Sequence, residues 1–150
     1  MSLKKWADNG WLKKYVTNRD EIANLLAIVE RDLKDAGEEE LSPDWRFGIA
    51  YNAALKLCNI LLYARGYRAS HGAHHYRPIA ALPLILGEGK EKDSKYLEAC
   101  RVKRNIVEYD YVGAVTEEEA IEIRGFAEDF KREVITWPGI LGELEINIRF

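Results

Sequence analysis

The sequence predicts an all-α fold, an antiparallel up-and-down bundle of four to five helices in a single domain. Three observations support this class. Apolar residues recur at helical spacing in long segments of the 150-residue chain. Helix start signals precede several of these segments, and glycine follows most of them. The alternation typical of a strand is confined to a short segment near the carboxyl terminus.

The first two expected helices belong to the amino-terminal half of the chain. The first runs from about Asn18 to Ala36, and Gly37 follows it. Its apolar residues share one helical face: Ile22, Leu25, Leu26, Val29 and Leu33. The second helix has Ser42 as its N-cap and Pro43 in its first position, and it continues to about residue 64. Because nearly all its later residues are apolar, we expect it to be the central and most buried helix.

A narrow polar stripe interrupts this second helix. Asn52, Lys56 and Asn59 recur at helical spacing. The two amides either face solvent along the stripe or lie inside the fold, where they need hydrogen-bond partners. Tyr51 and Tyr63 are interpreted as core aromatic residues.

The middle of the chain predicts a loop, a short helix and a longer one. Residues 67–75 form the loop, and the short helix spans about 76–86 with a bend near Pro83. The longer helix runs from about 93 to 109. One side of it carries apolar residues, namely Tyr96, Ala99, Cys100, Val102, Ile106 and Val107. A separate and mostly charged side carries Leu97, Arg101, Arg104 and Glu108.

The last expected helix runs from about Glu117 to Val134, and residues 116–119 form a capping box at its start. Its buried stripe consists of Ala120, Ile123, Ala127, Phe130 and Val134. The core domain therefore covers about 18–134, with a carboxyl-terminal extension over 137–150. Residues 144–150 alternate apolar and polar side chains, which predicts a short strand. The segment containing Trp6 and Trp11 is expected to pack against the bundle.

Composition restricts the function more than it defines it. The formal net charge of −3 excludes a uniformly basic coat for nucleic acid. Cys58 and Cys100 lie in apolar helical patterns and are expected to be reduced core residues. We find no apolar run of about 18 residues and no signal-peptide pattern, so we expect no membrane span and a cytoplasmic location. No phosphate-binding glycine loop, nucleophile elbow or paired-cysteine site is present, so no cofactor or metal is expected.

The strongest candidate site lies at the end of the helix over 93–109. Arg104 supplies a planar fork suited to phosphate, and Arg101 lies three residues earlier on the same face. Asn105 and Tyr109 are neighbours at i and i+4, and Asp110 could fix the rotamer of an arginine. The alternative is that the arginines form a solvated face with intrahelical ion pairs.

A second cluster contains all three histidines. Arg68, His71, His74 and His75 lie in or beside the loop over 67–75. Histidine can act as an acid or base near neutral pH, and this spacing can also serve a metal. No cysteine or carboxylate in the segment completes a ligand set, so metal binding is not expected. The structural alternative is that these residues cap a helix or bind loop carbonyls.

Three features together resemble the HEPN superfamily of small prokaryotic helical proteins. They are the long apolar helix led by Ser42 and Pro43, the loop from Gly66 to Tyr76, and the sequence RNIVEYDY from Arg104. The resemblance covers roughly 18–134. It implies an up-and-down helical bundle that commonly forms a homodimer. It also implies a link with minimal nucleotidyltransferases in toxin–antitoxin or defence modules, and the active members are metal-independent ribonucleases.

The family motif is an arginine, a polar residue and a histidine four to six positions later. In this chain the arginine is Arg104 and the polar residue is Asn105, whereas Tyr109 stands where the histidine is expected. A tyrosine with an ordinary pKa of about 10 is a poor base at neutral pH. It can still donate a proton or bind phosphate.

Two main hypotheses follow from this resemblance. In the first, the chain is an RNA-directed endoribonuclease whose Arg104 and Arg101 hold the scissile phosphate, with Tyr109 or a loop histidine moving the proton. In the second, the chain is a non-catalytic module that binds RNA or a nucleotide, or docks on a nucleotidyltransferase through its tail. A third reading is a helical protein whose resemblance to the family is accidental.

Overall fold

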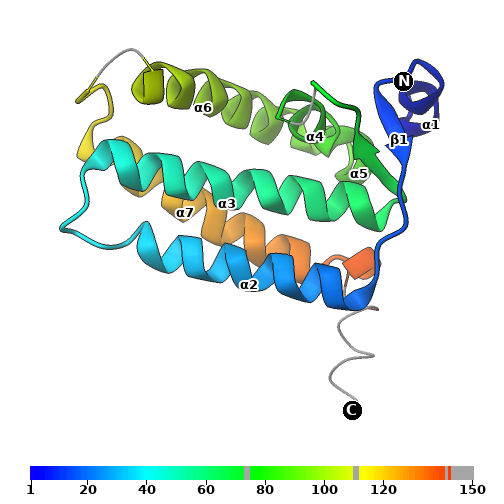
Figure 1. Cartoon of the computed structure of the whole chain (residues 1–150), viewed down its shortest axis with the longest axis horizontal. Coiled ribbons are helices and arrows are strands. Elements are labelled where there is room, and N and C mark those ends of the chain that lie inside the picture. The colour runs from blue at the N-terminus through cyan, green and yellow to red at the C-terminus, as the bar shows by residue number, and fades with distance from the viewer. Residues whose placement is uncertain (73–74, 110–111, 141, 143–150) are drawn as a thin grey trace.

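The computed structural model describes residues 1–72, 75–109, 112–140 and 142. Its long helices are α2 (Arg19–Asp35), α3 (Pro43–Ala64), α6 (Glu91–Tyr109) and α7 (Glu117–Thr136). Shorter elements are α1 (Leu3–Asp8), β1 (Leu12–Lys14), β2 (Tyr67–Ala69), α4 (Tyr76–Ala80), α5 (Leu82–Leu86) and the 3₁₀ turn η1 (Glu88–Lys90). The all-α class is thus confirmed (Figure 1).

Helix α3 lies at the centre of the fold. It contacts α2, α6 and α7, and the chain places these long helices alongside it (Figure 1). Tyr51, Leu57 and Leu61 of α3 are completely buried. By length and composition alone, α3 qualifies as a membrane span, with a mean hydropathy of 1.3. Its packing against α2, α6 and α7 leaves 56% of this apolar stretch buried inside the fold.

Local capping fixes the starts of α3 and α7, as predicted. The Ser42 hydroxyl accepts a hydrogen bond from the Trp45 amide at 3.1 Å. In α7 the Thr116 hydroxyl accepts from the Glu119 amide at 3.1 Å, and the Glu119 carboxylate accepts from the Thr116 amide at 3.0 Å. These bonds satisfy backbone donors that have no partner within the helix. All five residues of the predicted α7 stripe are buried.

A small sheet replaces part of the predicted loop. Strands β1 and β2 pair antiparallel, with Lys13 opposite Arg68. The ladder joins the amino-terminal segment to the chain that leaves α3, so the pairing depends on residues far apart in sequence. Trp6 is buried, and the guanidinium of Arg77 lies 3.9 Å from the ring centroid of Trp11. The predicted docking of the Trp6–Trp11 segment is confirmed.

The short helical region over residues 76–86 breaks at a different residue from the one predicted. The sequence predicted one helix bent near Pro83, but α4 and α5 are separate helices that meet at Ala81. The break comes before the proline because Pro83 has no amide hydrogen to bond back into α4. Gly87 then ends α5 with φ of 108°, in the left-handed region that favours glycine.

The predicted faces of α6 require a correction. Leu97, placed on the charged side, is completely buried. Val102 and Ile106, placed on the apolar side, are 47% and 37% exposed. The charged side of α6 therefore turns toward α3, and part of its apolar side faces outward. The two sides of α6 differ only weakly in apolar character. Its periodicity therefore did not predict which side packs against α3.

Other expectations have mixed outcomes. Cys58 and Cys100 are free and buried, as predicted. Tyr51 is a core residue, while Tyr63 is only half-buried. The expected strand over 144–150 lies outside the described residues.

Candidate functional site

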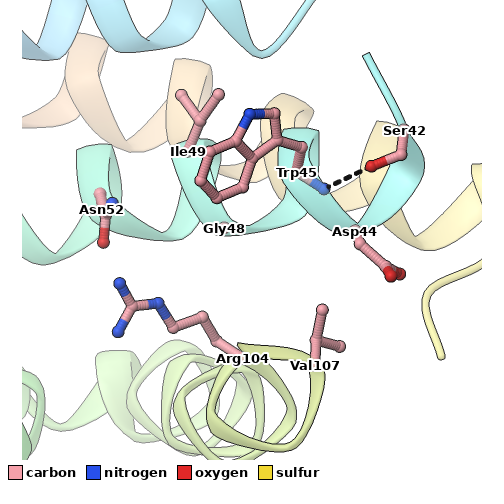
Figure 2. A pocket seen from close by; sticks show the side chains of 8 residues that line it. All are labelled: Ser42, Asp44, Trp45, Gly48, Ile49, Asn52, Arg104 and Val107. Carbon is pink, nitrogen blue, oxygen red and sulfur yellow. Dashed lines mark hydrogen bonds between the residues drawn. The ribbon is translucent and has the colours of Figure 1, made fainter. Parts of the chain in front are cut away.

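A pocket of about 330 Å³ opens between the first turns of α3 and the last turns of α6. Figure 2 shows its lining side chains, most of which come from α3. Those residues are Ser42, Asp44, Trp45, Gly48, Ile49 and Asn52 from the start of α3, and Arg104 and Val107 from α6. The strongest predicted site residue, Arg104, therefore faces a concave site and not a flat outer surface.

Helix α3 builds its wall of the pocket by simple spacing. Trp45, Ile49 and Asn52 lie at i, i+4 and i+7, which places them on one helical face. Between them, Gly48 has no side chain, and a Cβ there would meet nothing within 4 Å. The glycine leaves open space in the wall. Trp45 is 62% exposed, so its indole forms an accessible apolar surface at the mouth of the pocket.

Asp44 closes one end of the pocket and tethers the loop before α7. Its two carboxylate oxygens accept hydrogen bonds from the backbone amides of Gly113 at 2.7 Å and Val115 at 3.2 Å. The carboxylate thus connects the start of α3 with the chain that leaves α6. These bonds hold the aspartate in one orientation beside the pocket.

Arg104 reaches across the pocket from α6. Figure 2 shows its guanidinium extended toward α3 on the side where Asn52 lies, well separated from Asp44. The guanidinium carbon is also 5.8 Å from the ring centroid of Tyr51, within the range of a cation–π contact. A planar cation placed on an aromatic face beside an amide is suited to grip an anionic oxygen group.

Tyr51 connects Arg104 with the histidine loop. Burial raises the pKa of the Tyr51 phenol, and the nearby cations Arg101 and Arg104 oppose this rise only in part. The phenol therefore stays neutral at physiological pH. Its hydroxyl lies 3.3 Å from Nδ1 of His75, and the two rings stack with centroids 6.2 Å apart. Arg104 and His75 thus contact the same tyrosine, although His75 does not line the pocket.

The structure separates the two predicted phosphate-binding arginines. Arg101 makes a paired interaction with Glu98, from Nε to Oε2 at 2.9 Å and from Nη2 to Oε1 at 2.6 Å. This hydrogen bonding raises the pKa of Arg101. The intrahelical pair considered as the alternative is therefore correct for Arg101, which does not line the pocket. Asn105 is also absent from the lining, and Asn52 of α3 supplies an amide there instead.

The remaining predicted site residues are dispersed. Arg68 lies on β2 with its guanidinium 5.7 Å from the ring centroid of Tyr15, at the end of the molecule that carries β1 (Figure 1). The carboxyl end of α6 lies at the opposite end, so Arg68 does not share the pocket. His71 is exposed. His74 and Asp110, and the side chain of Tyr109, lie outside what the structure describes.

The described ranges contain no candidate metal site, and the arginines of a second pocket take part in helix packing. Within residues 1–72, 75–109 and 112–140, no group of three histidine, cysteine or acidic side chains could hold a metal ion. A pocket of about 340 Å³ between α2 and α7 contains Arg46 and Arg124. The Arg46 guanidinium is held by Glu117 at 2.5 Å, and Nε of Arg124 donates to the Leu33 carbonyl at 3.2 Å. These two arginines serve the packing of helices.

Sequence reasoning missed the contribution of Trp45 and Asp44. The spacing of Trp45 and Asn52 on one face of α3 was a signal that could have been used, because an indole and an amide in an otherwise apolar helix share one side. Nothing in the sequence of α3 indicated that this face lies opposite Arg104. No family model, no curated protein and no solved structure matches the chain.

Proposed function

We propose that this chain binds single-stranded RNA by taking one nucleotide into the Arg104 pocket. One observation carries the proposal: an arginine, an exposed tryptophan and an amide line the same concave site. A nucleotide has a charged phosphate, a flat aromatic base and polar sugar and base edges. The pocket offers one group for each of these parts, and its size of about 330 Å³ lies in the range of small-molecule sites.

Arg104 is the group assigned to the phosphate. Its guanidinium keeps its charge at any physiological pH and can donate two parallel hydrogen bonds to phosphate oxygens. The Tyr51 ring supports it at 5.8 Å. Asn52 lies on the same side of the pocket and can donate or accept at the sugar–phosphate backbone (Figure 2).

Trp45 is the group assigned to the base. This large aromatic side chain is 62% exposed, so much of its apolar surface contacts water unless a ligand covers it. Aromatic side chains bind single-stranded nucleic acid by stacking on bases, with about 1–3 kcal/mol per stacked base. A single cation and one stacking surface favour a weak, local contact, in keeping with the net charge of −3.

Binding fits the pocket better than catalysis does. No histidine is among its described lining residues, and the one carboxylate there, Asp44, is held by two backbone amides at the end of the pocket away from Arg104. Tyr51 keeps its proton because burial raises its pKa. The non-catalytic hypothesis therefore has more support from the geometry than the ribonuclease hypothesis.

The test measures binding of a fluorescently labelled heptaribonucleotide of random sequence by anisotropy. Arg104→Ala should weaken binding by about 10- to 100-fold, the typical value for a charge-assisted hydrogen bond. It should also reduce the slope of log K against log salt by about 0.7, the value for one phosphate contact on a single strand. Trp45→Ala should weaken binding by about 5- to 150-fold through lost stacking.

The matched control is Arg132→Ala. Arg132 is an exposed arginine on α7 that pairs with Asp129 and does not line the Arg104 pocket. Its removal takes away the same charge and should change binding less than twofold. Equal affinities for wild type, Arg104→Ala and Trp45→Ala would refute the proposed function.

A second candidate function is metal-independent RNA cleavage, as the HEPN resemblance implies. It is favoured by the shared contact of Arg104 and His75 with Tyr51. The test is incubation of the same RNA with the protein in excess EDTA. Cleavage by the wild type that is lost in both Arg104→Ala and His75→Ala would establish that both residues are needed for cleavage. Intact RNA after prolonged incubation would eliminate it.

The other implications of the family resemblance remain predictions. They are a homodimer, a minimal nucleotidyltransferase partner and a place in a toxin–antitoxin or defence module. The cytoplasmic location expected from composition is also still a prediction. Size-exclusion chromatography with light scattering on the whole chain tests the homodimer directly.

A further inference from the structure

Asp44 and Arg104 place opposite charges at different ends of the pocket. It is the single acidic side chain among the described lining residues, and Figure 2 places it across the pocket from the guanidinium of Arg104. A phosphate near Asp44 would meet a like charge, whereas a phosphate near Arg104 meets an opposite one. A nucleotide therefore enters with its phosphate toward Arg104 and its base toward Asp44, with Trp45 beside the base.

The Asp44 carboxylate keeps hydrogen-bonding capacity for a ligand. An ionised carboxylate has about four acceptor sites on its two oxygens. The backbone amides of Gly113 and Val115 use one site on each oxygen. Each oxygen can thus accept one further hydrogen bond. A group with two adjacent donors matches this arrangement best.

The carboxylate is also held in place before any ligand binds. Asp44 follows Pro43 in the first turn of α3, and the Ser42 cap fixes that turn. Its two amide contacts come from a different part of the chain, the loop before α7. A group restrained from both sides loses little conformational freedom when it binds, which favours selective recognition.

We propose that Asp44 makes the pocket selective for guanine, an inference that rests on the proposed RNA-binding function. The Watson–Crick edge of guanine carries two neighbouring donors, N1–H and the 2-amino group, which pair with the two oxygens of a carboxylate. Adenine presents an amino group beside an acceptor nitrogen, and cytosine does the same. Uracil presents one donor between two carbonyl oxygens. RNA-binding proteins commonly read these edges on unstacked bases.

The first experiment varies the base and leaves the protein intact. Four labelled heptaribonucleotides have three uridines on each side of a central guanosine, inosine, adenosine or uridine. Guanosine should bind tightest. Inosine lacks only the 2-amino group and should bind roughly tenfold more weakly, the typical loss for one hydrogen bond to a charged group. Adenosine should bind more weakly than inosine, because its acceptor nitrogen faces the carboxylate.

The second experiment changes the protein. Asp44→Asn replaces two acceptors by one acceptor and one donor, which complements the adenine edge and no longer matches guanine. The preference for guanosine over adenosine should fall at least tenfold or invert. Asp129→Asn on the exposed side of α7 is the matched control and should leave the preference unchanged. Circular dichroism spectra of both variants establish that each is folded.

The outcomes separate this inference from the function on which it rests. Equal affinity for the four heptamers, together with loss of binding in Arg104→Ala, would retain RNA binding and refute guanine selectivity. A guanosine preference that persists in folded Asp44→Asn would refute the role of Asp44. Absence of binding to all four heptamers would refute both proposals.

Discussion

Asp44 should contribute to folding as well as to recognition, and Asp44→Ala measures that contribution. The substitution removes the acceptor for the amides of Gly113 and Val115. The Val115 amide is partly buried, so leaving it unsatisfied costs about 1–3 kcal/mol. The Gly113 amide is exposed and can bind water, so its loss costs about 0.5–1 kcal/mol. The negative charge in the first turn of α3 adds about 0.3–1 kcal/mol.

Together these contributions predict a loss of about 2–5 kcal/mol in the free energy of unfolding. For a domain of this size, one kcal/mol moves the melting temperature by about 2–4 °C, so the melting temperature should fall by roughly 4–20 °C. The assay is thermal and urea unfolding followed by circular dichroism at 222 nm. Asp129→Ala removes an exposed aspartate, 77% accessible, and should change the stability by less than about 0.5 kcal/mol.

The result also bears on how the pocket is held together. A large loss for Asp44→Ala, with a smaller one for Asp44→Asn, would show that the tether depends on a side-chain acceptor at this position. If Asp44→Ala melted within about 1 °C of the wild type, the two amide contacts would contribute nothing and the restraint argued for Asp44 would be wrong.

Three further predictions concern stability and reactivity. Ile123→Ala should lower the free energy of unfolding by about 2–5 kcal/mol, because this side chain is completely buried. Ile121→Ala, at a 60% exposed position two residues earlier, should lower it much less, and urea unfolding of both variants measures the difference. The hydrogen bond from Arg46 lowers the pKa of Glu117 from its ordinary 4.5, so the ion pair stabilises the fold above that pH and is lost as the pH falls. The urea midpoint of the wild type should therefore decline between about pH 5 and pH 3, and Glu117→Gln should make this decline less steep. An unchanged slope would contradict the prediction. Burial raises the pKa of the Cys100 thiol to about 11, so a thiol reagent at pH 8 should label it far more slowly in the native protein than in urea, and equal rates would contradict the burial.

Helix starts and the buried face of α7 were predictable because their signals are local. The caps at Ser42 and Thr116 join residues three positions apart, so the sequence of a single turn contains both partners. The α7 stripe repeats strongly enough to define one buried face. The centrality of α3 followed in the same way from its almost unbroken apolar composition.

The candidate site was predictable at one position only. Arg104 was identified because arginine chemistry suits phosphate and because the helix was expected to end nearby. Two of its expected companions do not line the pocket with it. Arg101 is paired with Glu98, and Asn105 lies outside the pocket, because the path of α6 over α3 selects which side chains converge.

What the sequence determined by itself is the set of helices, their caps and the chemical character of single residues. These properties depend on backbone hydrogen bonds and side-chain spacing within a few turns. The tertiary structure alone decided that β1 meets β2, that the charged side of α6 turns inward, and that Trp45, Asn52 and Arg104 surround one pocket. Such contacts join distant segments, and their energies depend on how whole helices pack, so no short stretch of sequence contains them.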